Sequence, residues 1–153
     1  MTALTNGPGP LPTAAEDHAA ITDVLHRYAT AVDQRDWTLF RTCWTDDIDA
    51  EYGTIGQFST ADALTQKMTR FHQPMGASNH LISNVVVEFA PDDSDRARVV
   101  SYVHAVRMLS PGTPAASVDV IGTYEDVFVR TADGWRIRGR TFHLTRLVTN
   151  QPV

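Results

Sequence analysis

Apolar residues in the first part of the chain recur with the spacing of an amphipathic helix. Over residues 14–32 they fall three and four positions apart, so they share one helical face. Thr13 and Glu16 form a Thr-x-x-Glu capping box, which predicts that this helix begins directly after Thr13. Two further helices are expected, over residues 37–43 and 60–71.

After residue 76 the pattern changes to runs rich in β-branched and aromatic residues. Four long strands are expected, over residues 80–89, 97–109, 117–130 and 135–148. Their connections are the size of turns, and Ala132-Asp133-Gly134 is typical of a hairpin. A short extended piece is also expected before Tyr52 and Gly53. The pattern predicts an α+β fold, in which three helices pack on one face of a strongly curved antiparallel sheet.

These elements fit one domain over residues 14–150, preceded by a disordered leader over residues 1–13. The chain has 153 residues and is 42% hydrophobic, which allows a single core of its own. Its first residues lack the basic and apolar regions of a signal peptide. No run approaches the roughly 20 apolar residues of a membrane span. We therefore expect a soluble, cytoplasmic protein that does not associate with membranes.

Charge and cysteine content exclude several classes of function. The formal net charge is −5, and the 13 basic residues are mostly scattered, which argues against nucleic-acid binding. A single cysteine, Cys43, excludes an intramolecular disulfide and a cysteine-rich metal site, and its apolar neighbours predict burial. The histidines show neither His-x-His nor His-x-x-x-His spacing. We expect neither a metal nor a cofactor.

Candidate chemistry is concentrated where the first helix ends. Asp33 stands near the end of this helix, and His80 begins the first long strand. A carboxylate and an imidazole that face one apolar pocket can share a proton and act as a general base. Asp33 could instead cap the next helix, although Asp36 is better placed to do so. His80 could equally be a structural histidine at the start of a strand.

The order of elements and several residues resemble the nuclear transport factor 2-like superfamily and, within it, the SnoaL-like group. Scytalone dehydratase, bile-acid dehydratase and hexachlorocyclohexane dehydrochlorinase share an Asp and a His at the places of Asp33 and His80. The dehydrochlorinase has an Arg five residues after the Trp of its last strand, which matches Arg140. Tyr28 stands where these relatives hold a polar catalytic side chain. Tyr52 resembles the tyrosine that scytalone dehydratase uses, through water, on its substrate carbonyl.

The resemblance implies a cofactor-independent lyase, a dehydratase or eliminase, acting on a small hydrophobic and cyclic substrate. His80 would remove a proton, and Asp33 would orient it and make it more basic. Tyr28 or Tyr52 would hydrogen-bond the substrate oxygen where charge develops. Arg140 would steady Asp33 or the departing hydroxide or halide.

Further side chains are candidates for binding the substrate. His104 lies near the place of a second catalytic histidine of scytalone dehydratase, but in a different register when the two are aligned on Tyr102. The expected apolar lining consists of Phe58, Met68, Phe71 and Met108.

Other functions remain open at this point. An isomerase or polyketide cyclase of the same fold could use the same base. The chain could also be a non-catalytic subunit, like the β-subunit of aromatic-ring-hydroxylating dioxygenases, or a binding protein that keeps the pocket without turnover. Apolar residues on both faces of the last two strands predict self-association, as a homodimer or a homotrimer.

Overall fold

The computed structural model describes residues 13–112 and 115–151 of the chain. The expected leader therefore lies outside the described residues, apart from Thr13. The helices are α1 (Ala14–Gln34), α2 (Trp37–Thr42) and α3 (Ala61–His72), close to the predicted ranges. The strands are β1 (Trp44–Glu51), β2 (Gln57–Thr60), β3 (Ser78–Ala90), β4 (Asp93–Met108), β5 (Ser117–Thr131) and β6 (Gly134–Asn150), and a short 3-10 turn, η1 (Gly53–Ile55), follows β1.

Local capping interactions set the ends of the first two helices. The Thr13 side chain accepts a hydrogen bond from the Glu16 backbone, and Glu16 accepts one from the Thr13 backbone, so the predicted capping box is present. Helix α1 ends at Arg35, which has the left-handed φ of 59°. Asp36 then caps α2 by accepting a hydrogen bond from Leu39 N–H at 2.9 Å. Asp33 is therefore not needed as a cap.

The six strands form one sheet in the order β2-β1-β6-β5-β4-β3. Strands β3 to β6 pair antiparallel in sequence order, which confirms the predicted α+β cone. One refinement is needed, because β1 runs parallel to β6 and the sheet is therefore mixed. Strand β2 was not predicted, since its four residues are largely exposed and carry no clear apolar alternation.

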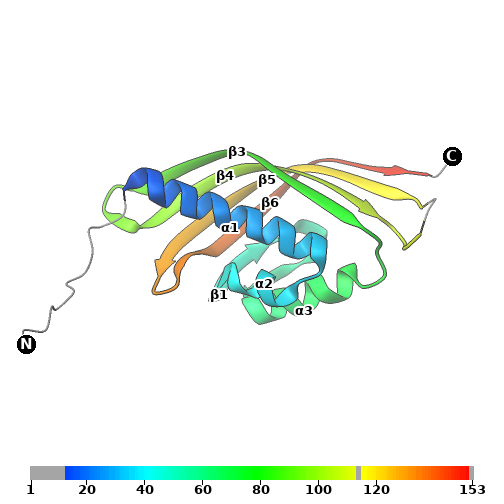
Figure 1. The fold of residues 1–153 in the computed structure, drawn as a ribbon, viewed down its shortest axis with the longest axis horizontal. Coiled ribbons are helices and arrows are strands. Elements are labelled where there is room, and N and C mark those ends of the chain that lie inside the picture. The colour runs from blue at the N-terminus through cyan, green and yellow to red at the C-terminus, as the bar shows by residue number, and fades with distance from the viewer. Residues whose placement is uncertain (1–12, 113–114, 152–153) are drawn as a thin grey trace, which may run out of the picture.

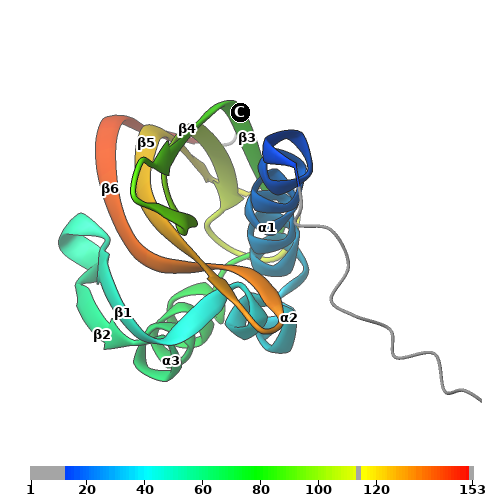
Figure 2. The same ribbon diagram turned by 90° about the vertical axis from the view of Figure 1, so that its left-hand side faces the viewer.

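The sheet curls around the helices without closing into a barrel. Figure 1 shows α1 lying along the long strands, with α2 and α3 gathered beneath its C-terminal half. In Figure 2, which is turned by 90°, the strands curve from β6 around to β3, beside α1. Helix α3 and strands β1 and β2 lie at the opposite end of this curve. This arrangement leaves the concave face of the sheet turned toward the helices.

The hydrophobic core fills the space between the helices and the concave face of the sheet. Alternate residues of β4 and β5 point into it, as the period of a strand requires. Cys43 is fully buried there, as expected, and burial raises the pKa of its thiol to about 11. A thiol with such a pKa stays protonated and unreactive at neutral pH.

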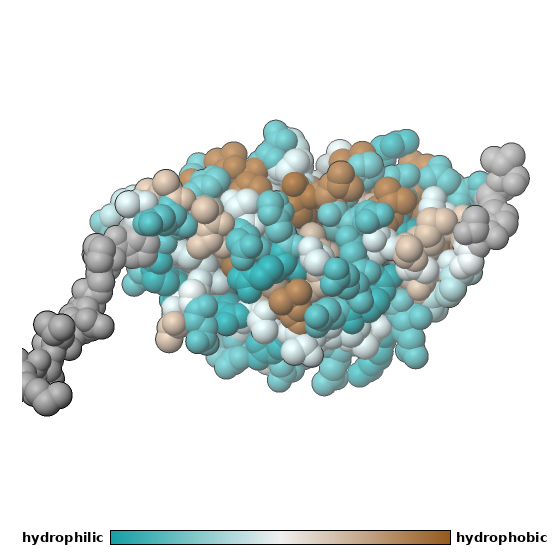
Figure 3. Space-filling view, viewed as in Figure 1, coloured by the Kyte–Doolittle hydropathy of each residue, from teal (hydrophilic) through white to brown (hydrophobic). Residues whose placement is uncertain are grey.

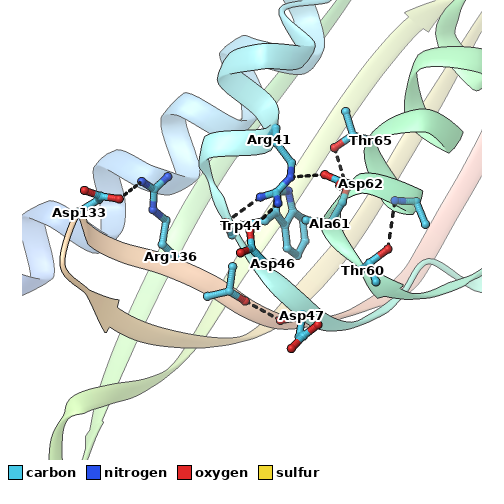
Figure 4. Close-up of polar contacts among 12 residues, drawn as sticks. Arg41, Trp44, Asp46, Asp47, Thr60, Ala61, Asp62, Thr65, Asp133 and Arg136 are labelled. Atoms are coloured by element: carbon cyan, nitrogen blue, oxygen red, sulfur yellow. Dashed lines mark hydrogen bonds and ion pairs between the residues drawn. The ribbon is translucent and has the colours of Figure 1, made fainter.

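A branched ion pair joins α2 to its neighbours, as Figure 4 shows. The Arg41 guanidinium donates to Asp46 on β1 and to Asp62 on α3, both at 2.6 Å. At the start of the same helix α3, the Thr60 side chain accepts a hydrogen bond from Ala63 N–H. These contacts hold α2, β1 and α3 together at the end of the cone.

Several large hydrophobic side chains are exposed. They lie on the long strands and the β4–β5 connection: Leu81, Val86, Tyr102, Leu109, Leu144 and Leu147. Figure 3 shows hydrophobic groups along the edge of the molecule where the long strands run in Figure 1. The homodimer or homotrimer expected from the sequence stays a prediction.

Among the described residues, no helix is both long enough and apolar enough to cross a membrane.

Candidate active site

The last turn of α1 and the start of β3 bring Asp33 and His80 into direct contact. His80 Nδ1 lies 2.6 Å from Asp33 Oδ1, and the His80 backbone N–H donates to Asp33 Oδ2 at 2.8 Å. The Ser78 hydroxyl donates to Asp33 Oδ1 at 2.9 Å. Three hydrogen bonds from one strand therefore hold this carboxylate, and the two residues proposed as a base lie within hydrogen-bond reach.

Arg35 fixes the junction between the two elements. Its guanidinium donates to Val32 O and to Gly76 O, each at 2.6 Å, and to Ser78 Oγ at 2.8 Å. Because Ser78 accepts from Arg35 and donates to Asp33, the arginine orients the hydroxyl that holds the carboxylate. Sequence reasoning missed this role, since nothing in the local sequence indicates that the guanidinium turns back toward β3.

The hydrogen bonds set the charge of Asp33. Burial opposes ionisation, but the side-chain and backbone hydrogen bonds from His80 outweigh it, and the pKa of Asp33 is lowered. An ionised Asp33 accepts a hydrogen bond from the Nδ1–H of His80, and this hydrogen bond selects the imidazole tautomer that is protonated on Nδ1. In that tautomer the Nε2 lone pair of His80 is the free basic position, and no described residue hydrogen-bonds it.

His80 lines an apolar cavity inside the cone. The inner chamber has a free volume of about 60 Å³, and His80 shares its wall with Tyr28, Tyr52, Met68 and Phe71, among others. A wider mouth of about 410 Å³ adjoins it, and the two share several lining residues, including Tyr52 and Phe71. The two spaces are therefore neighbours along the same wall.

Two of the expected lining residues lie elsewhere. Phe58 packs against the hydrophobic core beside Gly56 and lines neither chamber nor mouth. Met108 lies at the end of β4, where its backbone pairs with Ala77, and it lines neither chamber nor mouth. Both predictions are wrong, because apolar character alone does not show toward which side of an element a side chain points.

His104 is also excluded from the cavity. Its neighbours Val103 and Ala105 face the chamber, so the alternation of β4 turns His104 to the outer face. There it is half-exposed, with Nε2 2.7 Å from Asp119 Oδ1 on β5. The prediction that His104 binds substrate is therefore wrong, and this histidine joins two strands on the outside of the sheet.

Arg140 is buried, but its partner is not Asp33. It forms a two-pronged ion pair with Asp126 on β5, with both N–O distances at 2.7 Å. Its guanidinium carbon also lies 4.3 Å from the ring centre of Tyr28 and 3.8 Å from that of Tyr124. Burial alone would lower the pKa of Arg140, but the Asp126 carboxylate raises it above the usual range. The expectation that Arg140 steadies Asp33 is corrected, because Asp126 holds the guanidinium.

The two candidate tyrosines form a pair beside this arginine. The hydroxyls of Tyr28 and Tyr52 are 3.0 Å apart, and Arg140 Nη1 lies 3.5 Å from the Tyr52 hydroxyl. Burial raises the pKa of both phenols, so both remain protonated hydrogen-bond donors. The same cavity wall therefore carries two phenols and the His80 imidazole.

Two polar residues of the cavity wall were not predicted. His72 at the end of α3 bonds Met68 O through Nδ1 at 2.9 Å, and burial lowers the pKa of this histidine to about 4. Its Nε2 is buried and has no partner among the described residues. Arg107 on β4 lines both the chamber and the mouth, and its buried Nε likewise lacks a partner among the described residues. A usable signal existed for Arg107, because it alternates with the inward-facing Val103 and Ala105.

Within residues 13–112 and 115–151, no three His, Cys, Asp or Glu side chains are grouped so that they could hold a metal ion.

The fold is the curved α+β cone of the nuclear transport factor 2-like proteins. An acid–imidazole pair lies on the wall of its apolar cavity. The SnoaL-like domain model matches residues 13–141, so the chain belongs to the SnoaL-like family. The chain matches no curated protein sequence.

Solved structures share the whole fold. The Kfla4162 protein from Kribbella flavida is 26% identical with a TM-score of 0.79, and the match covers 89% of this chain and 95% of that one. A candidate scytalone dehydratase from Novosphingobium aromaticivorans is 18% identical with a TM-score of 0.79, covering 91% and 94%. A hexachlorocyclohexane dehydrochlorinase from Novosphingobium barchaimii is 18% identical with a TM-score of 0.77, covering 91% and 93%.

Proposed function

We propose that this protein is a cofactor-independent lyase-type enzyme in which Asp33 and His80 act together as a general base. Family membership and the dehydratase and dehydrochlorinase among its structural neighbours support an enzyme of the lyase or isomerase type. The observation that carries the finer proposal is the 2.6 Å contact between Asp33 and His80 on the wall of an apolar cavity. The substrate would be small, hydrophobic and cyclic, to suit that wall.

The proposed reaction begins with proton removal from a carbon next to a carbonyl. His80 Nε2 takes the proton, and the ionised Asp33 stabilises the imidazolium that forms. The electron pair of the broken C–H bond forms a carbon–carbon double bond as hydroxide or halide leaves from the adjacent carbon. The proton on His80 then neutralises the leaving group, so the products are an alkene and water or a hydrogen halide.

Tyr28 and Tyr52 would stabilise the charge that develops on the carbonyl oxygen. Both phenols are neutral donors on the wall of a largely apolar cavity, where an oriented hydrogen bond is most effective. Arg140, held by Asp126, packs against the Tyr28 ring and lies beside the Tyr52 hydroxyl, so the ion pair would help to keep both phenols in place. An isomerase or cyclase could use the same base and donors, with the proton returned to another carbon instead of a leaving group departing.

The test uses a panel of cyclic β-hydroxy ketones, whose dehydration gives a conjugated enone with a new ultraviolet absorbance. Asp33→Asn and His80→Ala should each lower turnover by about 10²–10⁴-fold, the usual contribution of general base catalysis. Matched controls are Asp23→Asn, on the exposed face of the same helix, and His143→Ala, on an exposed part of β6. Both controls should retain activity.

Full activity in either Asp33→Asn or His80→Ala would rule out the base. A shifted double bond without loss of water would assign the isomerase alternative. Binding of these ketones without turnover, at unchanged affinity in both variants, would assign a binding protein. Co-purification with a larger iron–sulfur protein would favour the non-catalytic subunit.

A further inference from the structure

The cavity carries a positive charge that no carboxylate of its wall balances. Arg107 lies on β4 opposite Ser78 of β3 and Val118 of β5, and it faces inward with Val103 and Ala105. It lines both the inner chamber and the mouth. The Phe71 ring packs against it, with the guanidinium carbon 5.1 Å from the ring centre.

The other arginines removed from solvent have partners within the described residues, and Arg35 is held by two backbone carbonyls and the Ser78 hydroxyl. Arg140 is paired with Asp126, and Arg130 is paired with Asp17 and Asp95, at distances of 2.7 Å. Arg107 forms no ion pair or hydrogen bond with any residue that the structure describes, and its Nε is buried. A buried polar nitrogen without a hydrogen-bond partner is costly, so the retention of this arginine points to a partner that arrives from outside the chain.

The surroundings of Arg107 also favour an anion. No Asp or Glu is among the described residues that line the chamber or the mouth. Besides Arg107 and three tyrosines whose phenols stay neutral, the titratable groups there are His72 and His80 in the chamber and Lys67 at the mouth. Arg107 and Lys67 therefore place positive charge at this opening, although the chain as a whole has a net charge of −5. A cleft lined by one sign of charge between apolar walls concentrates ligands of the opposite sign.

We propose that Arg107 binds a carboxylate on the substrate, so that the substrate class is small cyclic or aromatic acids. The planar guanidinium suits two-pronged binding of a carboxylate, and the Phe71 ring packs against it. With the carboxylate bound by Arg107, a compact reacting group of the substrate enters the small chamber beside His80. The remaining apolar body occupies the wider mouth. This assignment rests on the proposed function for the reaction, whereas acid binding can be measured without turnover.

Calorimetric titration of the full chain near neutral pH tests the assignment with two matched pairs of probes. These are benzoate with benzamide and cinnamate with cinnamamide, which differ within each pair in charge but hardly in shape. The acid should bind at least about tenfold more tightly than its amide, as expected of a charge-assisted hydrogen-bonded pair. In Arg107→Gln the ratio of the two affinities should fall to about one. A thermal melt checks that this variant folds.

The matched control is Arg98→Gln on the same strand. Arg98 lies outside the cavity and is paired with Glu88 and Glu125, so the substitution removes the same charge without touching the proposed site. It should keep the preference for acids.

Three outcomes overturn the assignment. They are equal affinity for acid and amide in the unaltered chain, preference for acids that survives in Arg107→Gln, and absence of measurable binding of both acids. A chain that binds acids through Arg107 but dehydrates neither neutral nor carboxylate-bearing β-hydroxy ketones disproves the proposed reaction alone. Turnover of neutral ketones without any preference for acids disproves the Arg107 site alone.

Discussion

Asp33 on α1 accepts two hydrogen bonds from His80 on β3, one from the ring nitrogen Nδ1 at 2.6 Å and one from the backbone N–H at 2.8 Å. The backbone bond fixes where the strand begins relative to the helix, and the ring bond fixes the imidazole. One carboxylate therefore serves both the packing of α1 on β3 and the orientation of the proposed base. This double role explains why changes at Asp33 should affect stability as well as activity.

Stability should depend on the ionisation of Asp33. The pKa of Asp33 is lowered in the folded chain, because hydrogen bonds from His80 outweigh the effect of burial. The ionised carboxylate therefore stabilises the fold at pH values above the unfolded pKa of an Asp, about 3.9, and this contribution is lost as the pH falls through the lower folded pKa. Asp33→Asn should be less stable than the unaltered chain near neutral pH, with a difference that shrinks in acid. Urea denaturation across this range measures it, and a difference independent of pH would contradict the explanation.

His72 should titrate in acid and weaken the fold there. Burial lowers its pKa from 6.5 to about 4 in the folded chain. Between these values the unfolded chain binds more protons than the folded one, so the free energy of unfolding falls as the pH drops from 6.5 toward 4. Proton–carbon NMR of the imidazole should show the shifted titration. In His72→Gln this part of the pH dependence of stability should disappear, and an unchanged slope would show that other groups cause it.

Removing one partner of the Arg140–Asp126 ion pair should destabilise the fold more than removing both partners together. Arg140→Met leaves Asp126 buried without its partner and should lower the free energy of unfolding by about 3–5 kcal/mol. Arg140→Met combined with Asp126→Leu should recover most of this loss, because no unpaired charge remains. Urea denaturation of the two single variants and the double variant tests this. Additive losses would show that packing around the guanidinium, rather than its charge, is what the fold requires.

Much of the architecture could be predicted from local patterns. The helical spacing before Asp33, the capping box at Thr13 and the four strand-like runs each depend on neighbouring residues, which a sequence displays directly. The parallel pairing of β1 with β6 could not be predicted, because it joins residues that are far apart and leaves no local signal. The short strand β2 was missed for the related reason that it is too short to show a period.

The candidate site, like the fold, was predicted only in part. Asp33 and His80 could be paired through the family resemblance, which fixes the place of each on its element. Asp126 escaped notice, although a charged residue between the inward-facing Tyr124 and Phe128 of β5 signals a buried ion pair. His104 failed the same test of alternation, since Val103 and Ala105 on either side of it are buried. The alternation of inward and outward residues along a strand would therefore have excluded His104 from the cavity and identified Asp126 as buried.

The contact between Tyr28 and Tyr52 leads to a last prediction. Tyr28→Phe and Tyr52→Phe each remove one hydroxyl of a buried pair that is 3.0 Å apart. If the pair stabilises an oxyanion, loss of the donor that touches the substrate should lower kcat by about 10²–10³-fold with a smaller change in KM. The other variant should have a weaker effect on kcat, because its hydroxyl acts by positioning the first.

Tyr102→Phe is the matched control for these two variants, since Tyr102 is exposed on β4 and lies outside the cavity. Its kcat should not change. Steady-state kinetics on any accepted ketone distinguishes the two phenols, and thermal melts separate an effect on folding from one on catalysis. Equal, small changes in kcat for both cavity variants would leave the phenols as packing residues, and the charge on the substrate oxygen would then need another donor from the wall.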